Sequence, residues 1–507
     1  MAQGILPFKY ELEKSGAGMT ALGGLPLYLD LTKVVGLSKS IGRHLRVRDK
    51  GQGWTDSQMV TALVMLNLAG GDHVEDLRGL EEDEGWCQVL RRVELHGLKR
   101  KERRALERRW RKEKRRSVPS PSAVFRYLAA FHDEGEERQR QVGRAFIPRP
   151  NGHLAGWSHV NKDLVAFLQS KRCEKTATLD MDATLAQTHK AGALYCYEHY
   201  KAYQPLNTYW AEQGVVIHTE FRDGNVPAGY EQLRVLKQAL RQLPEGVDKI
   251  RLRSDTAGYQ HDLLRYCESG ENDRFGRIEF AISCDVTEEF KRAVGQVAQS
   301  EWRPIYREEN GERVETGREW AEVCFVPNKI GHRKHGLEYR YLATREPLRQ
   351  LELPWGEEQG KLPFQTLEMR QQRYKIFGMV TNMDWEGGRL IVWQQERCGK
   401  SEEVHKVMKD DLAGSMLPSG DFGENAAWWW IMVLSLNLNV IMKSLVLGGA
   451  WGSKRMKAIR FGVIHLPGRI LSRARGLVVR LEKKCSAYRL LIEARTKMAE
   501  LAVVPSG

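Results

Sequence analysis

The chain contains 507 residues, of which 42% are hydrophobic and 9% aromatic, so it is too long for one ordinary core and too apolar to be disordered. Lysine and arginine number 79 against 65 aspartates and glutamates, and the resulting formal charge of +14 favours a polyanionic partner. Eight cysteines without metal-ligand spacing, and no secretory signal at the start of the chain, predict reduced thiols in the cytoplasm.

The first 150 residues predict a helical region. Asp56 can cap a helix whose apolar residues continue to Leu68, and Gly70-Gly71 ends it before a second helix at about 73–80. Helix, glycine turn and helix fit a unit that reads DNA, and they fit any other helical hairpin equally well.

A strongly basic run follows at residues 99–116, where twelve lysines or arginines stand beside three glutamates. A solvated helix face is the simpler explanation, but so many cations exceed what solubility requires. An arm that follows phosphates is therefore the favoured interpretation. Its candidate DNA-binding residues are Arg108, Arg109, Arg111 and Lys112.

From about residue 176 the pattern changes to alternating strands and helices. The strand at 178–185 places Asp180 and Asp182 on one face, which an acidic strand face or a strand-end turn could also explain. A later strand at 249–253 delivers Asp255 at its carboxyl end, where α/β sheets usually hold ligands. Two strands thus bring an aspartate to a place where both could meet.

Residues 285–393 predict a β-rich insertion of short strands separated by turns rich in glycine and glutamate, the last strand at 389–393. A helix is expected at 401–412, with Glu402, Lys406 and Lys409 on one face. The apolar stretch 426–442 carries Asn437 and Asn439, which favours a buried helix over a membrane span, with its Trp-Trp-Trp run in the core.

Asp182, Asp255 and Glu402 resemble, in type and order of element, the Asp-Asp-Glu triad of bacterial insertion-sequence DDE transposases. The family's first aspartate stands in an Asp-x-Thr step, as in Asp182-Ala-Thr184, and its second ends a strand, as Asp255 does. Asp180 is the rival for the first position, but it lacks the threonine at the right step.

The family's glutamate belongs to a Tyr-x2-Arg-x3-Glu-x6-Lys signature on a helix after the insertion. Glu402 and Lys409 match its second half, whereas Arg397 has four residues before Glu402 instead of three. Glu403 is the rival acid, and its spacing to Lys409 is one residue short.

The resemblance implies a multidomain α+β protein with a ribonuclease-H-like α/β catalytic core. The core would comprise residues 176–284 and 394–443, interrupted by the β-rich insertion at 285–393. A helical region for DNA-end binding and assembly at 1–150 and a basic helical C-terminal region at 444–507 would flank it. The expected location is the bacterial cytoplasm, in association with the nucleoid.

The implied chemistry is metal-dependent phosphoryl transfer. Asp182, Asp255 and Glu402 would bind two Mg²⁺ ions, for which Mn²⁺ can substitute, while Arg397, Lys406 and Lys409 hold phosphates. Water would cleave double-stranded DNA at the terminal inverted repeats, and the freed 3′-hydroxyl would attack target DNA. Pairing of two ends implies a homodimer, and no membrane is involved.

Two other functions fit the same residues. A metal-dependent nuclease would cut DNA without strand transfer, and a non-catalytic derivative would only bind it. The acidic triad speaks against the derivative, because three converging carboxylates repel phosphate unless metal is present. The Tyr- and His-rich stretch at 189–203 either touches DNA beside the active site or covers the sheet.

Overall fold

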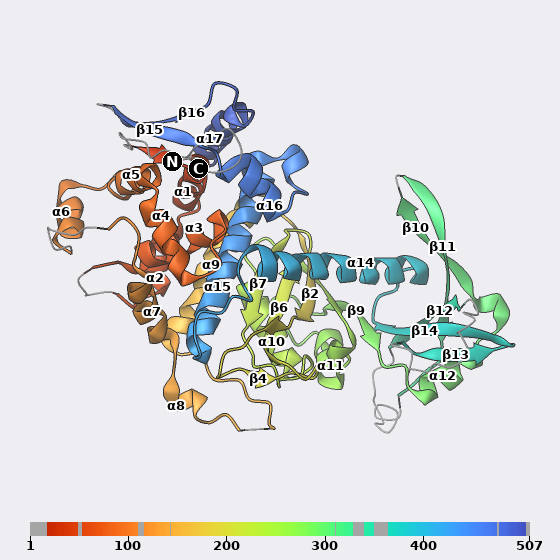
Figure 1. The fold of residues 1–507 in the computed structure, drawn as a ribbon. Helices are drawn as coiled ribbons and strands as arrows, with labels where there is room; N and C mark the ends of the chain where they lie inside the picture. The colour runs from red at the N-terminus through yellow and green to blue at the C-terminus, as the bar shows by residue number, and fades with distance from the viewer. Residues whose placement is uncertain are drawn as a thin grey trace, which may run out of the picture.

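The computed structural model describes residues 18–48, 53–109, 116–141, 143–309, 311–327, 339–348, 364–473 and 476–502. A larger part holds the helices of both ends of the chain, and the strands β10–β14 lie beyond it at the far end of the long helix α14 (Figure 1). A ten-stranded sheet connects the two parts, in the order β10-β11-β12-β14-β9-β8-β2-β6-β7 with β13 beside β14.

The half of this sheet in the larger part has the strand order of a ribonuclease-H-like core, as predicted. Central β2 runs parallel to β8, and β8 runs parallel to β9, whereas β6 and β7 form an antiparallel hairpin on the other side of β2. The five strands are β2 (Thr176–Ala183), β6 (Leu206–Trp210), β7 (Val215–Glu220), β8 (Lys249–Ser254) and β9 (Glu279–Cys284).

The β-rich segment after residue 284 continues this sheet. Its strands are β10 (Arg303–Glu309), β11 (Glu312–Val323), β12 (Arg340–Pro347), β13 (Thr366–Met369) and β14 (Gln372–Thr381). Antiparallel pairing of β14 with β9 makes the connection, with Gly378 opposite Cys284. The expected last strand at 389–393 is wrong: α14 (Gly387–Lys406) already begins there, because the Glu386 carboxylate accepts the backbone N–H groups of Gly388 and Arg389.

Among the described residues up to Lys171, most are helical. The helix predicted at Asp56 is confirmed, but its N-cap is Thr55, which forms a capping box with Gln58, and Asp56 is the first helical residue; Gly70 ends the helix at a φ of 99°. The helices are α1 (Pro26–Val34), α2 (Leu37–His44), α3 (Asp56–Ala69), α4 (Leu77–Glu82), α5 (Glu84–Glu94), α6 (Arg100–Arg108), α7 (Pro121–Leu128), α8 (Glu134–Glu137) and α9 (Gly152–Lys171).

The remaining elements cover the sheet or follow it. Helices α10 (Gln232–Gln242), α11 (His261–Ser269) and α12 (Glu288–Gly295) connect strands, and β3 (Ala186–Gln187), β4 (Leu194–Tyr195) and β5 (Lys201–Tyr203) form a small separate sheet after β2. A π-helical turn, Val407–Asp411, extends α14.

The prediction of a helical C-terminal region is only partly correct. Between α16 (Met456–Ile459) and α17 (Tyr488–Ala502) it contains the antiparallel strands β15 (Gly468–Arg473) and β16 (Gly476–Leu481), and β1 (Met19–Thr20) pairs with β15. The two strands read Gly-Arg-Ile-Leu-Ser-Arg and Gly-Leu-Val-Val-Arg-Leu, so no regular period of two is evident in their sequence.

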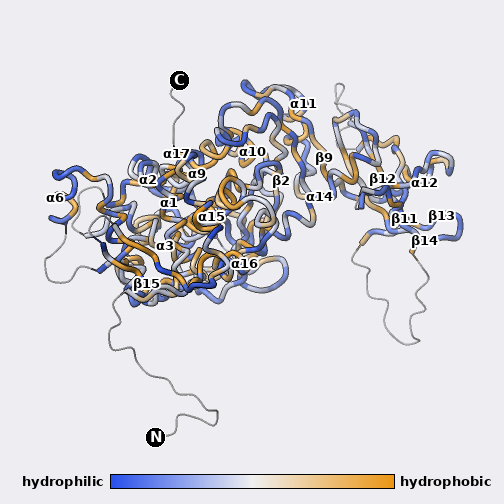
Figure 2. Tube along the Cα trace, turned by 90° about the horizontal axis from the view of Figure 1, so that it is seen from above, coloured by the Kyte–Doolittle hydropathy of each residue, from blue (hydrophilic) through white to orange (hydrophobic). Residues whose placement is uncertain are grey.

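Helix α15 (Phe422–Ile441) forms the centre of the larger part, where Figure 2 shows its hydrophobic residues. The helical stretch Phe422–Leu447 is long and apolar enough to cross a membrane, but 78% of its most apolar window is buried inside the protein. Asn437 is a polar residue in this buried helix because its side-chain amide pairs with the edge strand β7. It accepts the backbone N–H of Val216 at 3.0 Å and donates to the Val216 carbonyl at 2.8 Å. All three tryptophans of the Trp-Trp-Trp run are buried.

One buried ion pair ties three of these elements together. The guanidinium of Arg253 on β8 donates to both carboxylate oxygens of Asp180 on β2, at 2.6 and 2.8 Å, and to the carbonyl of Trp393 on α14 at 2.6 Å. Both charged side chains are almost completely buried. Asp180 is therefore a structural residue, and its partner fixes the position of α14 over β2 and β8.

Breaking this pair should destabilise the core strongly. Asp180→Asn removes the buried carboxylate and leaves the guanidinium with the half-exposed Glu396 carboxylate at 3.7 Å, so we expect a loss of about 3 kcal/mol or more in the free energy of unfolding. The exposed pair between Lys175 and Asp248, 3.2 Å apart, is the control, and Asp248→Asn should cost less than about 1 kcal/mol. Urea unfolding followed by tryptophan fluorescence measures both, and equal midpoints for the two variants would contradict the structural role.

Candidate active site

Asp182 and Asp255 lie at the same edge of the sheet, at the carboxyl ends of neighbouring parallel strands. Met181 is paired in register with Ser254, so the next residue of each strand is one of the two aspartates. The Asp255 carboxylate accepts the backbone N–H of Ala257 at 3.0 Å, which holds it at the start of a 3₁₀ turn. The geometry thus brings together the two aspartates that the sequence singles out.

Helix α14 passes directly over Asp182. Arg397 lies buried on this helix with its Nη1 3.1 Å from Asp182 Oδ2. Two turns later, His405 Nε2 lies 3.3 Å from the side-chain amide of Asn207, the residue opposite Asp182 on β6. One face of α14 therefore contacts the strand that carries the aspartate.

The electrostatics of this edge disfavour a charged Asp182. Burial raises the pKa of Asp182 to about 6; the cation of Arg397 opposes this rise, and the nearby charges of Asp255 and Asp180 add to it. Burial also lowers the pKa of His405 to about 4, helped by Lys409 and Arg397, so its ring is neutral at neutral pH. The negative charge of Asp182 and Asp255 is therefore only partly balanced by the cation of Arg397.

These residues fit a divalent metal ion in donor type. Carboxylate oxygens are hard ligands, and a cation between Asp182 and Asp255 would relieve the repulsion that raises the pKa of Asp182. The buried Nε of Arg397 and Oγ of Ser401 have no hydrogen-bond partner among the described residues. Polar groups left open beside two acids suit a site that is completed by a ligand with oxygen atoms.

The third acid is not brought into contact with the other two. Glu402 is exposed on α14, and no hydrogen bond or ion pair of the described residues joins it to Asp182 or Asp255. Across the described ranges, no three His, Cys, Asp or Glu side chains stand close enough to hold a metal ion. Glu403, the rival of Glu402, lines a cavity together with Tyr209 and Lys443.

The predicted phosphate-binding cations occupy different environments. Arg397 is engaged with Asp182, Lys406 is exposed, and Lys409 donates to the carbonyl of Leu185 at 3.2 Å from the π-helical turn after α14. Leu185 is three residues beyond Asp182, so Lys409 also belongs to this edge of the sheet.

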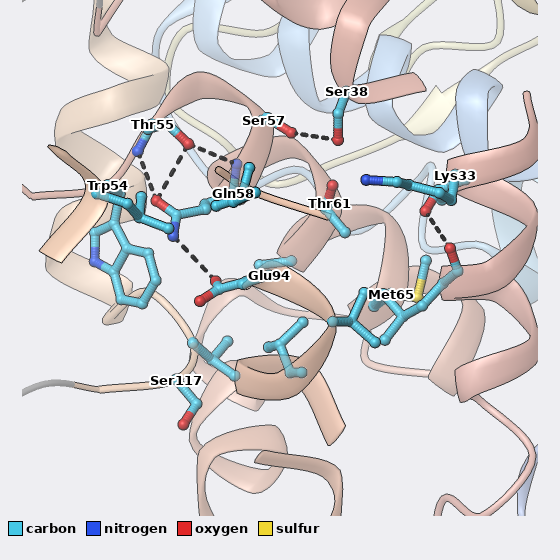
Figure 3. A pocket seen from close by; sticks show the side chains of 18 of the residues that line it. Lys33, Ser38, Trp54, Thr55, Ser57, Gln58, Thr61, Met65, Glu94 and Ser117 are labelled. Atoms are coloured by element: carbon cyan, nitrogen blue, oxygen red, sulfur yellow. Dashed lines mark hydrogen bonds between the residues drawn. The ribbon is translucent and has the colours of Figure 1, made fainter. Parts of the chain in front are cut away.

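In the basic run, Arg108 and Arg109 differ. Arg108 is exposed at the end of α6, whereas Arg109 donates to the carbonyls of Gly53 and Arg48 at 3.0 and 3.2 Å. Arg109 also lines a cavity of about 600 Å³ among the N-terminal helices, distant from Asp182 and Asp255, whose polar end includes Thr55, Gln58 and Glu94 (Figure 3). Arg111 and Lys112 lie outside the described residues.

Sequence reasoning missed the two residues that complete this edge, Asn207 and His405. Asn207 lies on β6, a strand that was not predicted, and His405 carried no motif. The spacing of Arg397, Ser401 and His405 at i, i+4 and i+8 is the signal that could have placed all three on one helix face.

Comparison with known families identifies the class. Residues 8–503 match the family described as "Transposase DDE domain group 1", so the chain belongs to this family. The protein is accordingly an enzyme, a DNA transposase that depends on divalent metal ions, and DNA is its partner. Its origin in a bacterial insertion sequence stays a prediction.

Among solved structures, the chain is similar to the "Cryo-EM structure of piggyBac transposase synaptic complex with hairpin DNA". The TM-score is 0.44 at 10% sequence identity, over 97% of this chain and 85% of that chain. A TM-score of this size carries no argument about mechanism. A comparison with curated proteins gives no significant match.

Arg397 should control the ionisation of Asp182. Arg397→Gln removes the cation that opposes the raised pKa of about 6, so the pKa of Asp182 should rise further, by roughly one unit. Because the carboxylate forms only above that pKa, the acidic limb of the pH–rate profile for DNA cleavage should move to higher pH. Arg397→Lys, which keeps the charge, should move it less. A limb that stays in place or moves to lower pH in Arg397→Gln would refute this control.

Proposed function

We propose that Asp182, Asp255 and Glu402 are the catalytic carboxylates of this transposase and that they hold two Mg²⁺ ions, with Mn²⁺ as a substitute. The observation that carries the proposal is the placement of Asp182 and Asp255 in register at one sheet edge, with the pKa of Asp182 raised. Bound ions would supply charge neutralisation at the reacting phosphate and an activated oxygen for in-line attack.

Glu402 joins this pair in the proposed DNA-bound state. It lies between Arg397 and His405 along α14, and these two residues contact Asp182 and its cross-strand neighbour Asn207. At a rise of 1.5 Å per residue, Glu402 follows Arg397 by about 7.5 Å along the axis of α14. At about 100° per residue it lies about 140° around the helix from Arg397, so the proposal requires a rotation of α14 about its axis, next to the π-helical turn that follows, together with a change of the Glu402 side-chain conformation.

Arg397 has two successive tasks in this proposal. Without ligands it pairs with Asp182 at 3.1 Å and keeps part of the acidic edge neutral. When the carboxylate engages a metal ion, the guanidinium can turn to a phosphate, for which its unpartnered Nε already offers a donor. Lys406 and Lys409 would hold the neighbouring phosphates.

The DNA substrates would be the terminal inverted repeats of the element and the target duplex. After hydrolytic cleavage at the ends, the 3′-hydroxyl would attack the target, which completes a cut-and-paste reaction. We propose a homodimer that pairs the two ends, in the cytoplasm and associated with the nucleoid. Residues 1–150 would bind ends and assist assembly, residues 176–284 and 394–443 would form the catalytic core, 285–393 its insertion, and 444–507 a basic C-terminal region.

Substitution of each acid tests the catalytic assignment. Asp182→Asn, Asp255→Asn and Glu402→Gln should each lower the Mg²⁺-dependent cleavage of element-end DNA by roughly a thousandfold or more, because each removes a metal ligand. DNA binding without metal should change little, as measured by fluorescence anisotropy.

Glu403→Gln is the matched control for the third acid. Glu403 neighbours Glu402 on α14 but lines the cavity with Tyr209 and Lys443, so its loss should leave cleavage within about twofold of wild type. The assignment of Glu402 fails if Glu403→Gln abolishes cleavage while Glu402→Gln retains it.

Two adjacent arginines test the basic arm. Arg108→Gln should weaken DNA binding and reduce the slope of log K against log salt by about one, because an exposed cation leaves the phosphate contact. Arg109→Gln should leave that slope unchanged and instead lower stability by about 1–3 kcal/mol, since the backbone carbonyls of Gly53, Arg48 and Trp54 lose their donor. An unchanged slope in Arg108→Gln would argue against a phosphate-binding arm at this position.

A further inference from the structure

A second, open cavity adjoins the proposed active site. It has a volume of about 850 Å³, and we call it the Lys409 groove. Its polar lining includes His73, His189, Lys190, Tyr200, Lys409 and Asp410. These residues come from the N-terminal region, from the segment that holds the small sheet β3-β5-β4, and from the π-helical turn.

The groove begins where the proposed catalytic elements end. Leu185 belongs to its lining and follows Asp182 by three residues, and Lys409 follows Glu402 by seven. The hydrogen bond of 3.2 Å from Lys409 Nζ to the Leu185 carbonyl joins the two ends. A polymer held at Asp182 and Asp255 that extends past Leu185 therefore enters this groove.

Two lysines in the groove are already oriented. Lys190 Nζ donates to the Pro418 carbonyl at 3.2 Å, and Lys409 Nζ donates to the Leu185 carbonyl at the same distance. An ammonium group has three N–H donors, so each lysine keeps two for a ligand. Little side-chain entropy remains to be lost when they bind an anion, which favours binding.

The lining also fits a nucleic acid in its other chemistry. The ammonium groups of Lys190 and Lys409 outnumber the single carboxylate, that of Asp410, so positive charge predominates. Tyr200 supplies a phenol ring on which a base can stack. The hydrophobic contacts that a protein segment would need are few here, since Leu185, Met416 and Leu417 are its apolar side chains.

We propose that the Lys409 groove binds the DNA strand that adjoins the cleavage position, with Lys190 and Lys409 on its phosphates and Tyr200 against a base. This inference rests on the proposed catalytic role of Asp182 and Asp255. Beyond the phosphate role already proposed for Lys409, it adds Lys190 and Tyr200 as DNA-binding residues.

Matched pairs of variants test the groove. Lys190→Ala and Lys201→Ala each remove one lysine whose Nζ binds a carbonyl, Pro418 for Lys190 and Ala191 for Lys201, but only Lys190 lines the groove. Tyr200→Ala is paired with Tyr195→Ala, because Tyr195 is exposed outside the groove on the same segment. The probe is a duplex with the terminal repeat and its flanking DNA, bound without divalent metal.

The groove variants should bind this duplex about tenfold more weakly, and their partners within about twofold of wild type. A scan in which a neutral methylphosphonate replaces one phosphate at a time should then find a position beside the cleavage site that weakens wild-type binding. Lys190→Ala should show no further loss at that position, whereas Lys201→Ala should keep the full loss. A purely structural role of Lys190 would not produce this phosphate-specific result.

Four outcomes are decisive. Equal losses of duplex binding within each pair of variants would overturn the groove, and so would the absence of a sensitive phosphate beside the cleavage site. If wild-type cleavage is normal in these cases, the catalytic assignment stays intact. If the phosphate whose effect disappears in Lys190→Ala lies far from the cleavage site, that also overturns the groove, because the groove adjoins Asp182. Normal cleavage of the duplex by Asp182→Asn and by Asp255→Asn would overturn the catalytic proposal on which the groove rests.

Discussion

The buried guanidinium of Arg253 is the contact on which the geometry of the proposed active site depends. It binds Asp180 two residues before Asp182, it stands two residues before Asp255, and it reaches the carbonyl of Trp393 four residues before Arg397. One side chain thereby fixes the relative positions of two strands and a helix. Because this contact stabilises the fold beside them, the proposed catalytic carboxylates can keep a negative charge that is only partly balanced.

Burial first, and repulsion from neighbouring carboxylates second, raise the pKa of Asp182. The pKa of Asp182 is about 6 in the folded protein against 3.8 for the unpaired residue, so the folded state binds this proton more tightly. The stability that this group contributes is present below about pH 4 and is lost as the pH rises through about 6. At neutral pH the metal-free protein therefore carries a cost at Asp182, which a bound divalent cation would offset.

The sequence predicted the core well where local patterns determine structure. Alternation along a strand placed Asp180 and Asp182 on one face, and the order of elements predicted that Asp182 and Asp255 meet. It could not distinguish the buried pair of Asp180 with Arg253 from an acidic surface, since their contact joins residues far apart in the chain. The same limit hid the pairing of β14 with β9, the strand β6 that carries Asn207, and the carbonyls that engage Arg109. The position of Glu402 relative to the aspartates depends on a side-chain conformation, which no sequence pattern specifies.

The central claim is that Asp182, Asp255 and Glu402 converge on metal ions when DNA is bound. Its most direct test is a crystal structure of the protein with uncleaved element-end DNA and Mn²⁺, in which anomalous scattering locates the metal. The account predicts anomalous peaks within about 2.2 Å of oxygen atoms from all three carboxylates and from the scissile phosphate. Peaks coordinated by Glu403 in place of Glu402, or peaks that touch neither aspartate, would contradict it.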